Sequence, residues 1–237
     1  MTTLLHLDAS ARPGLSDRQP RGSHTRRLTA RFVEGWRRQR PLDHIVARDL
    51  GREPPTPVTG PWIEAAFTKP DRRDAGMNRV LAESDRLVSE LVAADVIVAG
   101  VPMYNFNVPA PFKAYIDNVV RVGRTFGFDR GRAGEPYWPL LANAGKTLVV
   151  LTSRGDFGYD AGGRIAHRNH VEASIRTAFA YIGITDLRSI AVEYDEFADE
   201  RLRSSLAEAD RAIDDLLDRL LDERRTCAGP HAVMTPA

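Results

Sequence analysis

Residues 95–109 read DVIVAGVPMYNFNVP, and this stretch decides the fold. Its first half is a nearly continuous apolar run rich in β-branched residues, which is typical of a strand covered on both faces. The run TLVVLT at residues 147–152 predicts a second central strand of the same kind. Three weaker strands are expected at residues 4–7, 44–48 and 189–192.

Amphipathic stretches separate these runs. Helices are expected at residues 25–39, 74–93, 109–122, 170–182 and 199–224. The segment 51–70 is rich in Pro and Gly and is expected to be a surface loop. Strands that alternate with helices predict an α/β protein, in which a parallel five-stranded sheet is doubly wound in three layers. Such sheets bind ligands at the carboxyl ends of their strands.

Length and composition limit the alternatives. The chain has 237 residues, 43% of them hydrophobic and 27% charged, which fits one globular domain over residues 1–224 with a flexible tail at 225–237. The 33 basic and 32 acidic residues leave no overall basic charge for binding nucleic acid. No long apolar window predicts a membrane span, no signal peptide is apparent, and the single cysteine, Cys227, cannot form an internal disulfide. A cytoplasmic protein is therefore expected.

The loop after the first predicted strand, residues 8–25, is rich in small hydroxyl residues and leads into a helix. Ser10, Ser23 and Thr25 lie there, beside the free backbone N–H groups of a helix N-terminus. Hydroxyl and N–H groups together suit a phosphate. The simpler alternative is that Ser23 only caps the helix.

Two further loops follow the central strands. Pro102 and Pro109 enclose an apolar and aromatic stretch that could hold a flat aromatic ring, although an ordinary strand-to-helix turn would also explain it. In the third loop, residues 152–158, Gly155 permits a ligand to approach the backbone closely, and a plain turn is the alternative. Three such loops at the ends of three strands favour a binding site more strongly than any one of them.

The block Met103-Tyr104-Asn105-Phe106-Asn107, followed by residues 113–117 (KAYID), resembles the FMN-dependent NADH azoreductase family. These are flavodoxin-like reductases of quinones and azo compounds. Further matching segments lie at residues 123–126, 152–155 and 181–186, and the resemblance extends over about residues 3–220 in the expected order.

The resemblance implies a set of FMN contacts. The phosphate would be held by Ser10, Ser23, His24 and Thr25. The isoalloxazine ring would be flanked by Pro102, Met103, Tyr104, Asn105 and Phe106. Its pyrimidine side would lie along Ser153, Arg154, Gly155 and Asp156. The family also implies a homodimer, in which Phe128 and Tyr181 of a partner subunit would cover the substrate side of the flavin.

The implied activity is a ping-pong reduction of quinones or azo compounds, with NADH or NADPH as the electron donor. The flavin carries this chemistry, so no catalytic side chain and no metal is expected. A flavodoxin-type electron carrier, a flavin-free binding domain on the same fold and a general flavin reductase remain as alternatives. Three departures from the family pattern stand out: a longer, arginine-rich first loop with Arg12, Arg18 and Arg21, an aspartate at position 156 where glycine is common, and an unusual segment at 131–141.

Overall fold

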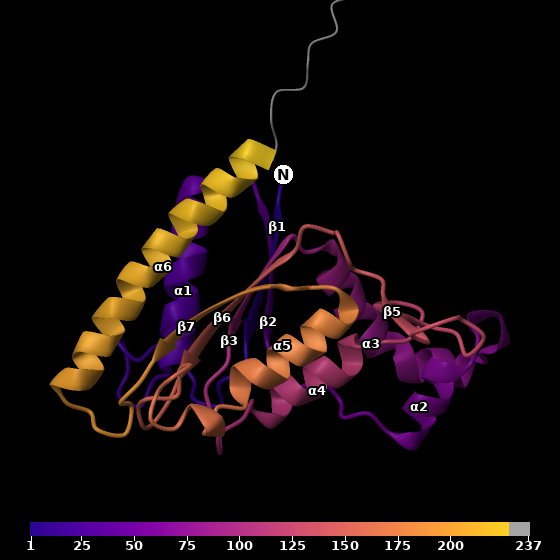
Figure 1. Ribbon diagram of the computed structural model, residues 1–237, viewed down its shortest axis with the longest axis horizontal. Coiled ribbons are helices and arrows are strands. Elements are labelled where there is room, and N and C mark those ends of the chain that lie inside the picture. Colours follow the sequence, from indigo (N-terminus) through magenta and orange to yellow (C-terminus); the bar gives the residue numbers. More distant parts are fainter. Residues whose placement is uncertain (228–237) are drawn as a thin grey trace, which may run out of the picture.

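A five-stranded parallel sheet forms the centre of the computed structural model, which describes residues 1–227 and the side chains of residues 1–225 (Figure 1). The strands lie in the order β2-β1-β3-β6-β7. Their bounds are β1 Thr3–Asp8, β2 His44–Asp49, β3 Val96–Gly100, β6 Thr147–Ser153 and β7 Asp186–Val192. The five strands expected from the sequence are confirmed, and this order is that of the flavodoxin-like doubly wound sheet.

Helices cover both faces of the sheet. On one face, α1 (His24–Gln39) packs beside the long α6 (Glu200–Cys227), and both contribute to one apolar cluster with Leu4 and Val98. The other face is covered by α3 (Ala75–Ala93), α4 (Ala110–Val119) and α5 (Val171–Ile182), which pack with Leu5 and Leu7. Neighbouring residues of β1 point to opposite faces, so one strand serves both cores.

The two central strands are buried along their whole length, as their apolar runs predict. Every residue of β3 and of β6 is buried. Strand β3 pairs with β1 on one side and with β6 on the other, so Gly100 lies beside Asp8 and Leu151. This register brings the loops after three adjacent strands to one edge of the sheet.

The segment 51–70 contains a helix, so the expected loop is wrong over part of its length. Helix α2 spans Gly60–Phe67, and a 3-10 turn, Pro70–Arg72, follows it. The hydroxyl of Thr59 caps α2 by accepting a hydrogen bond from the backbone N–H of Trp62. Gly60 and Pro61 stand at the start of this helix, where both residue types are tolerated. A segment rich in Pro and Gly can therefore contain a helix that its composition does not predict.

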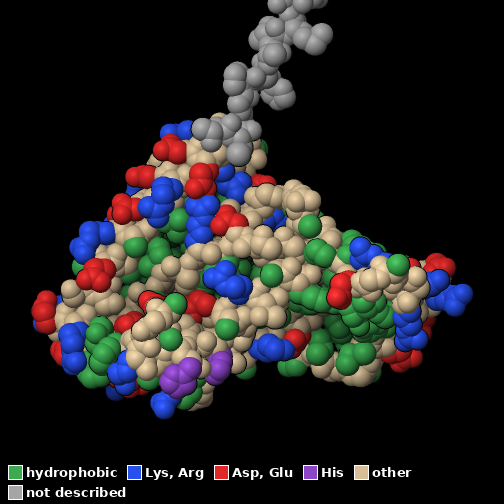
Figure 2. Space-filling view, in the orientation of Figure 1, with side chains coloured by type: hydrophobic (Ala, Val, Ile, Leu, Met, Phe, Trp, Pro, Cys, Tyr) green, Lys and Arg blue, Asp and Glu red, His purple; other side chains and the backbone are tan. Residues whose placement is uncertain are grey.

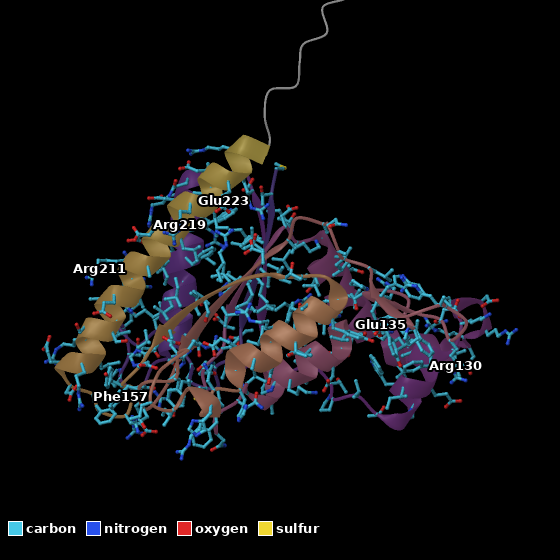
Figure 3. All side chains as sticks on the ribbon, in the orientation of Figure 1. Arg130, Glu135, Phe157, Arg211, Arg219 and Glu223 are labelled. Atoms are coloured by element: carbon cyan, nitrogen blue, oxygen red, sulfur yellow. The ribbon has the colours of Figure 1, made fainter. Side chains whose placement is uncertain are left out.

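A small antiparallel hairpin was also missed. Its strands are β4 (Phe126–Phe128) and β5 (Tyr137–Pro139), and Phe128 pairs with Tyr137. The unusual segment 131–141 therefore forms the hairpin loop and its second strand. In Figure 3 this loop, marked by Arg130 and Glu135, lies on the opposite side of the molecule from Phe157.

The ends of several elements differ from expectation by a few residues. Strand β7 begins at Asp186 and α4 ends at Val119. Helix α6 continues to Cys227, so residues 225–227 of the expected flexible tail are helical, and the rest of that tail lies outside the described residues. No helix within residues 1–227 is long and apolar enough to cross a membrane. Figure 2 shows basic and acidic side chains mixed along the exposed side of α6.

Candidate functional site

Two adjoining cavities form a groove at the carboxyl edge of the sheet. The first has a volume of about 330 Å³ and is lined by Ser10, Arg12, Ser23, His24, Pro102, Met103, Tyr104, Asn105, Ser153, Gly155, Asp195 and Glu196. The second, of about 300 Å³, is lined by Met103, Asn105, Phe106, Gly155, Asp156, Tyr159, Ile165, Arg168 and Glu196. Four shared lining residues join the two into one groove within the range of ~300–1,000 Å³ that is usual for small-molecule sites.

The N-terminus of α1 forms one wall of the groove. Ser23 is buried and caps the helix, because its Oγ accepts a hydrogen bond of 3.2 Å from the backbone N–H of Arg26. The Ser23 and Thr25 hydroxyls lie 3.0 Å apart, and Thr25 is fully buried behind the wall. The first turn of α1 contains no acidic residue. No side chain of that turn therefore offsets the partial positive charge that the helix end presents to the groove.

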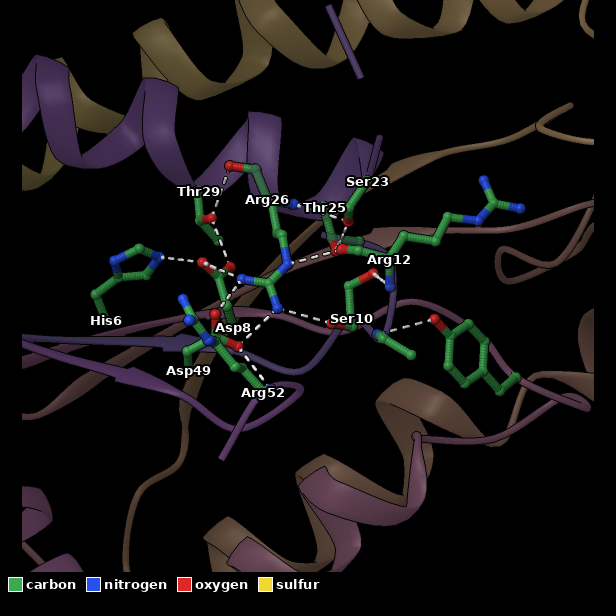
Figure 4. Close-up of polar contacts among 12 residues, drawn as sticks. His6, Asp8, Ser10, Arg12, Ser23, Thr25, Arg26, Thr29, Asp49 and Arg52 are labelled. Carbon is green, nitrogen blue, oxygen red and sulfur yellow. Dashed lines mark hydrogen bonds and ion pairs between the residues drawn. The ribbon is translucent and has the colours of Figure 1, made fainter. Parts of the chain in front are cut away.

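Arg26 holds the first loop in place from behind this wall (Figure 4). Its Nη2 donates to the backbone oxygen of Ser10 at 2.8 Å, and its Nε donates to that of Arg12 at 2.9 Å. Both terminal nitrogens also bind the Asp49 carboxylate, at 2.7 and 2.6 Å, and this hydrogen bonding raises the pKa of Arg26 above its ordinary value. The guanidinium therefore positions Ser10 without lining either cavity.

The aromatic loop after β3 forms a tight turn. Tyr104 and Asn107 exchange two backbone hydrogen bonds, of 2.9 and 3.1 Å. The two residues between them, Asn105 and Phe106, have positive φ angles of 49° and 70°. A turn with two central residues of positive φ is strained for Phe, which rarely adopts this conformation. Strain of this kind is commonly found at functional sites. The Tyr104 hydroxyl accepts a hydrogen bond from the backbone N–H of Ala11 at 3.2 Å, which ties this loop to the first.

The loops after β6 and β7 lie side by side and form the third wall. Backbone N–H groups of residues 194–196 donate to the carbonyls of Asp156, Arg154 and Gly155 at 3.1–3.4 Å. A Cβ atom at position 155 would lie 2.4 Å from the Glu196 carboxylate, so a larger residue there would displace this exposed side chain. The rings of Phe157 and Tyr194 stack with their centres 4.9 Å apart and strengthen the contact between the loops.

Asp195 and Glu196 were missed by the sequence reasoning. They follow β7, a strand at the edge of the sheet whose loop contains no glycine and matches none of the motifs singled out in the sequence. Asp195 contacts both basic side chains of the first cavity: His24 Nε2 lies 3.1 Å from Oδ1, and Arg12 Nη1 lies 3.4 Å from Oδ2. The hydrogen bond with His24 lowers the pKa of Asp195, and this outweighs the opposing effect of burial.

Arg154 and Asp156 differ in where their side chains lie. Arg154 is 1% exposed and binds three carboxylates, with Nη1 2.7 Å from Asp160 and 3.1 Å from Glu193, and Nη2 against Glu172. Its side chain therefore joins structural elements and lines neither cavity. Asp156 lines the second cavity, and the hydrogen bond from Arg164 at 2.7 Å lowers its pKa.

Phe128 and Tyr181 do not line the groove of their own chain. They belong to an aromatic cluster formed by the hairpin and α5, in which Phe128 stacks on Tyr137 at 4.8 Å and Tyr181 lies 5.0 Å from Phe126. Tyr137 and Tyr181 are 44% and 40% exposed, so the cluster presents aromatic surface to the outside of the subunit.

The structure thus brings together most of the predicted cofactor residues. Nine of them line the first cavity: Ser10, Ser23, His24, Pro102, Met103, Tyr104, Asn105, Ser153 and Gly155. Phe106 and Asp156 line the second, while the side chains of Thr25 and Arg154 lie behind the walls. Within residues 1–227 no group of three or more His, Cys, Asp or Glu side chains is arranged to hold a metal ion.

Comparison with known proteins gives concordant matches. The family model described as "Flavodoxin-like fold" matches residues 2–217. An FMN-dependent NADH:quinone oxidoreductase 2 of Idiomarina loihiensis is 41% identical over 213 residues, covering 90% of this chain and 88% of the relative. An FMN-dependent NADH:quinone oxidoreductase of Opitutus terrae is 44% identical over 221 residues, covering 93% and 99% of the two chains.

Solved structures agree on the fold. An azoreductase from Bacillus anthracis str. Sterne superposes with a TM-score of 0.79 at 21% identity, covering 92% of this chain and all of that one. An FMN-dependent NADH-azoreductase from Bacillus anthracis str. Ames Ancestor, solved in complex with FMN, gives a TM-score of 0.78 at 17% identity, with 93% and 99% of the chains covered.

Proposed function

Because the chain belongs to the family of FMN-dependent NADH:quinone oxidoreductases with the flavodoxin-like fold, we propose that it is an FMN-dependent NAD(P)H oxidoreductase that reduces quinones and azo aromatic compounds. The observation that carries this function is the groove itself. Eleven of the thirteen residues that the family resemblance implies as flavin contacts line its two cavities, at the strand ends where this fold binds ligands.

The residues of the groove fit FMN. Hydroxyl groups and free backbone N–H groups at the N-terminus of α1 suit the phosphate. The Nδ1 atom of His24 is buried and has no partner among the described residues, which leaves one polar atom for a ligand or water. Gly155 lets a flat ring approach the backbone of the third wall, and the turn at Asn105 and Phe106 lies on the opposite wall.

Each wall has its own task. When bound, FMN supplies the two-electron chemistry that links oxidation of NAD(P)H to reduction of an aromatic acceptor. Ser10 and Ser23 hold the phosphate end, and the backbone of residues 153–156 binds the polar edge of the ring. Pro102 and Met103 give that ring an apolar surface and exclude water from it. No side chain of the groove is required to act as an acid, a base or a nucleophile.

The enzyme is further proposed to be a homodimer of single-domain subunits, residues 1–224, that works in the cytoplasm. The exposed aromatic cluster of the hairpin and α5 supports the dimer, because such a surface is typical of subunit interfaces. Phe128 and Tyr181 would then bind the acceptor in the groove of the partner subunit. A single cysteine in 237 residues suits a reducing compartment.

A spectroscopic titration tests the proposal. The purified protein is mixed with FMN, then with NADH or NADPH, and finally with benzoquinone, and the flavin absorbance is followed. Bleaching by the nicotinamide and recovery with the quinone are expected. Bound flavin that neither nicotinamide bleaches would indicate an electron carrier, and absence of flavin binding would indicate a binding domain that shares only the fold. Parallel rates with quinones, an azo dye and free flavin separate the proposed reductase from a general flavin reductase.

A further inference from the structure

The charges of the first cavity are arranged around one carboxylate. Two basic side chains, Arg12 and His24, line this cavity, and both contact Asp195, each through a different carboxylate oxygen. Asp195 is itself a lining residue, with 22% of its side chain exposed. Glu196 also lines the cavity and forms no ion pair with either cation among residues 1–225.

Among the residues that line the first cavity, Arg12 and His24 are the only ones with basic side chains. Arg26, two residues after His24, is bound to Asp49 at 2.6 Å, lies 3.6 Å from Asp8, and does not line the cavity. The hydroxyl oxygens of Ser23 and Ser10 accept the backbone N–H groups of Arg26 and Arg12, which does not use the O–H donors that a phosphate would need. A phosphate group that enters this cavity therefore has to displace the Asp195 carboxylate from Arg12 and His24.

The formal charge of the cavity is also unfavourable to a phosphate. With His24 neutral, the lining carries one positive charge, on Arg12, and two negative charges, on Asp195 and Glu196. Because the effective dielectric constant at a half-buried site is well below that of water, a carboxylate a few ångströms from a phosphate repels it appreciably. Asp195 is the carboxylate that contacts both Arg12 and His24, the two basic side chains of this cavity.

We propose that Asp195 is a built-in competitor for the ligand phosphate: its carboxylate holds Arg12 and His24 and thereby sets how strongly the groove prefers a phosphorylated flavin over an unphosphorylated one. This inference rests on the proposed function. In the flavin-free protein the carboxylate ties the loop after β7 to the N-terminus of α1. Phosphate binding transfers Arg12 and His24 from Asp195 to the ligand and releases that tie.

The test compares FMN with riboflavin, which carries the same ring system without the phosphate. The dissociation constants of both flavins are measured by fluorescence quenching for the wild type and for D195N, and their ratio, Kd of riboflavin over Kd of FMN, is calculated. D195N is expected to raise this ratio on the order of tenfold, equivalent to about 1.4 kcal/mol, by tightening FMN alone. Riboflavin affinity is expected to stay within about twofold of the wild type.

The matched control is E196Q, which removes the neighbouring negative charge in the same cavity without freeing Arg12 or His24. Loss of this charge alone is expected to raise the ratio by no more than about twofold, and a rise equal to that of D195N would mean that only the net charge of the cavity matters. Thermal unfolding of the flavin-free proteins verifies that each variant is folded, and D195S replaces D195N should the asparagine variant fail to fold.

Two results would overturn the inference. An unchanged ratio in D195N would mean that Asp195 does not compete with the phosphate. A lower ratio would mean that it positions Arg12 and His24 for phosphate binding instead. Both outcomes leave the proposed function intact, provided that wild-type protein binds FMN. Wild-type protein that bound neither flavin would contradict the proposed function instead.

Discussion

At the scale of single residues, the groove depends on backbone conformations that few side chains tolerate. Asn105 and Phe106 both have positive φ angles, although neither is glycine. Asn adopts this conformation more readily than most residues, whereas the bulky Phe does so at a cost of about 1–2 kcal/mol. The two hydrogen bonds between Tyr104 and Asn107 and the one from His170 to the Phe106 carbonyl offset this strain.

Replacing Asn105 with Leu is expected to weaken FMN binding by at least about tenfold, because a branched apolar side chain would enter both cavities and strain the turn. Asn143 provides a matched control, since it also has a positive φ, of 63°, is exposed, and precedes β6 at the opposite end of that strand from the groove-lining Ser153. Both N105L and N143L should lose about 1 kcal/mol of stability in thermal unfolding. Equal FMN affinity in the two variants would contradict the assignment of this turn to the flavin.

At the scale of elements, the central strands could be predicted from the sequence because their β-branched runs can only be buried on both faces. The hairpin could not, since strands of three residues carry too little periodicity to be distinguished from a loop. The roles of Asp195 and Arg154 depend on contacts between loops that are distant in the chain, and a spacing pattern does not encode such contacts. The motif block from Met103 to Asn107 was informative through its resemblance to a known family, and four of its five residues line the groove.

Arg154 joins three elements and is expected to be the most sensitive ionic position near the groove. R154M should destabilise the protein by about 3–5 kcal/mol, because it leaves the half-buried carboxylates of Glu172 and Glu193 without a counter-charge. The control is R164M, which removes an ion pair whose arginine is 52% exposed and should cost less than about 1 kcal/mol. Urea unfolding of flavin-free protein measures both. Similar losses of unfolding free energy in the two variants would show that the buried cluster around Arg154 stabilises the protein no more than a surface ion pair does.

At the scale of the whole molecule, the groove and the aromatic cluster are separate features of one subunit. The groove is built from the loops after β1, β3, β6 and β7, whereas the cluster belongs to the hairpin and to α5. A subunit could therefore bind flavin on its own, while the proposed acceptor site needs Phe128 and Tyr181 from a second subunit. Loss of the proposed dimer should therefore impair binding of the acceptor without impairing binding of the flavin.

Y181R is expected to convert the dimer into a monomer, because it places a charge in the centre of the exposed aromatic surface. The FMN dissociation constant should stay within about threefold of the wild type, whereas KM for the quinone should rise on the order of tenfold or more as the partner's aromatic surface is lost. Sedimentation velocity gives the oligomeric state, and steady-state kinetics give KM. L42R is the control: Leu42 is 78% exposed and lies outside the cluster, so a charge there should leave both assembly and KM unchanged. A dimeric Y181R with normal KM would place the subunit interface elsewhere.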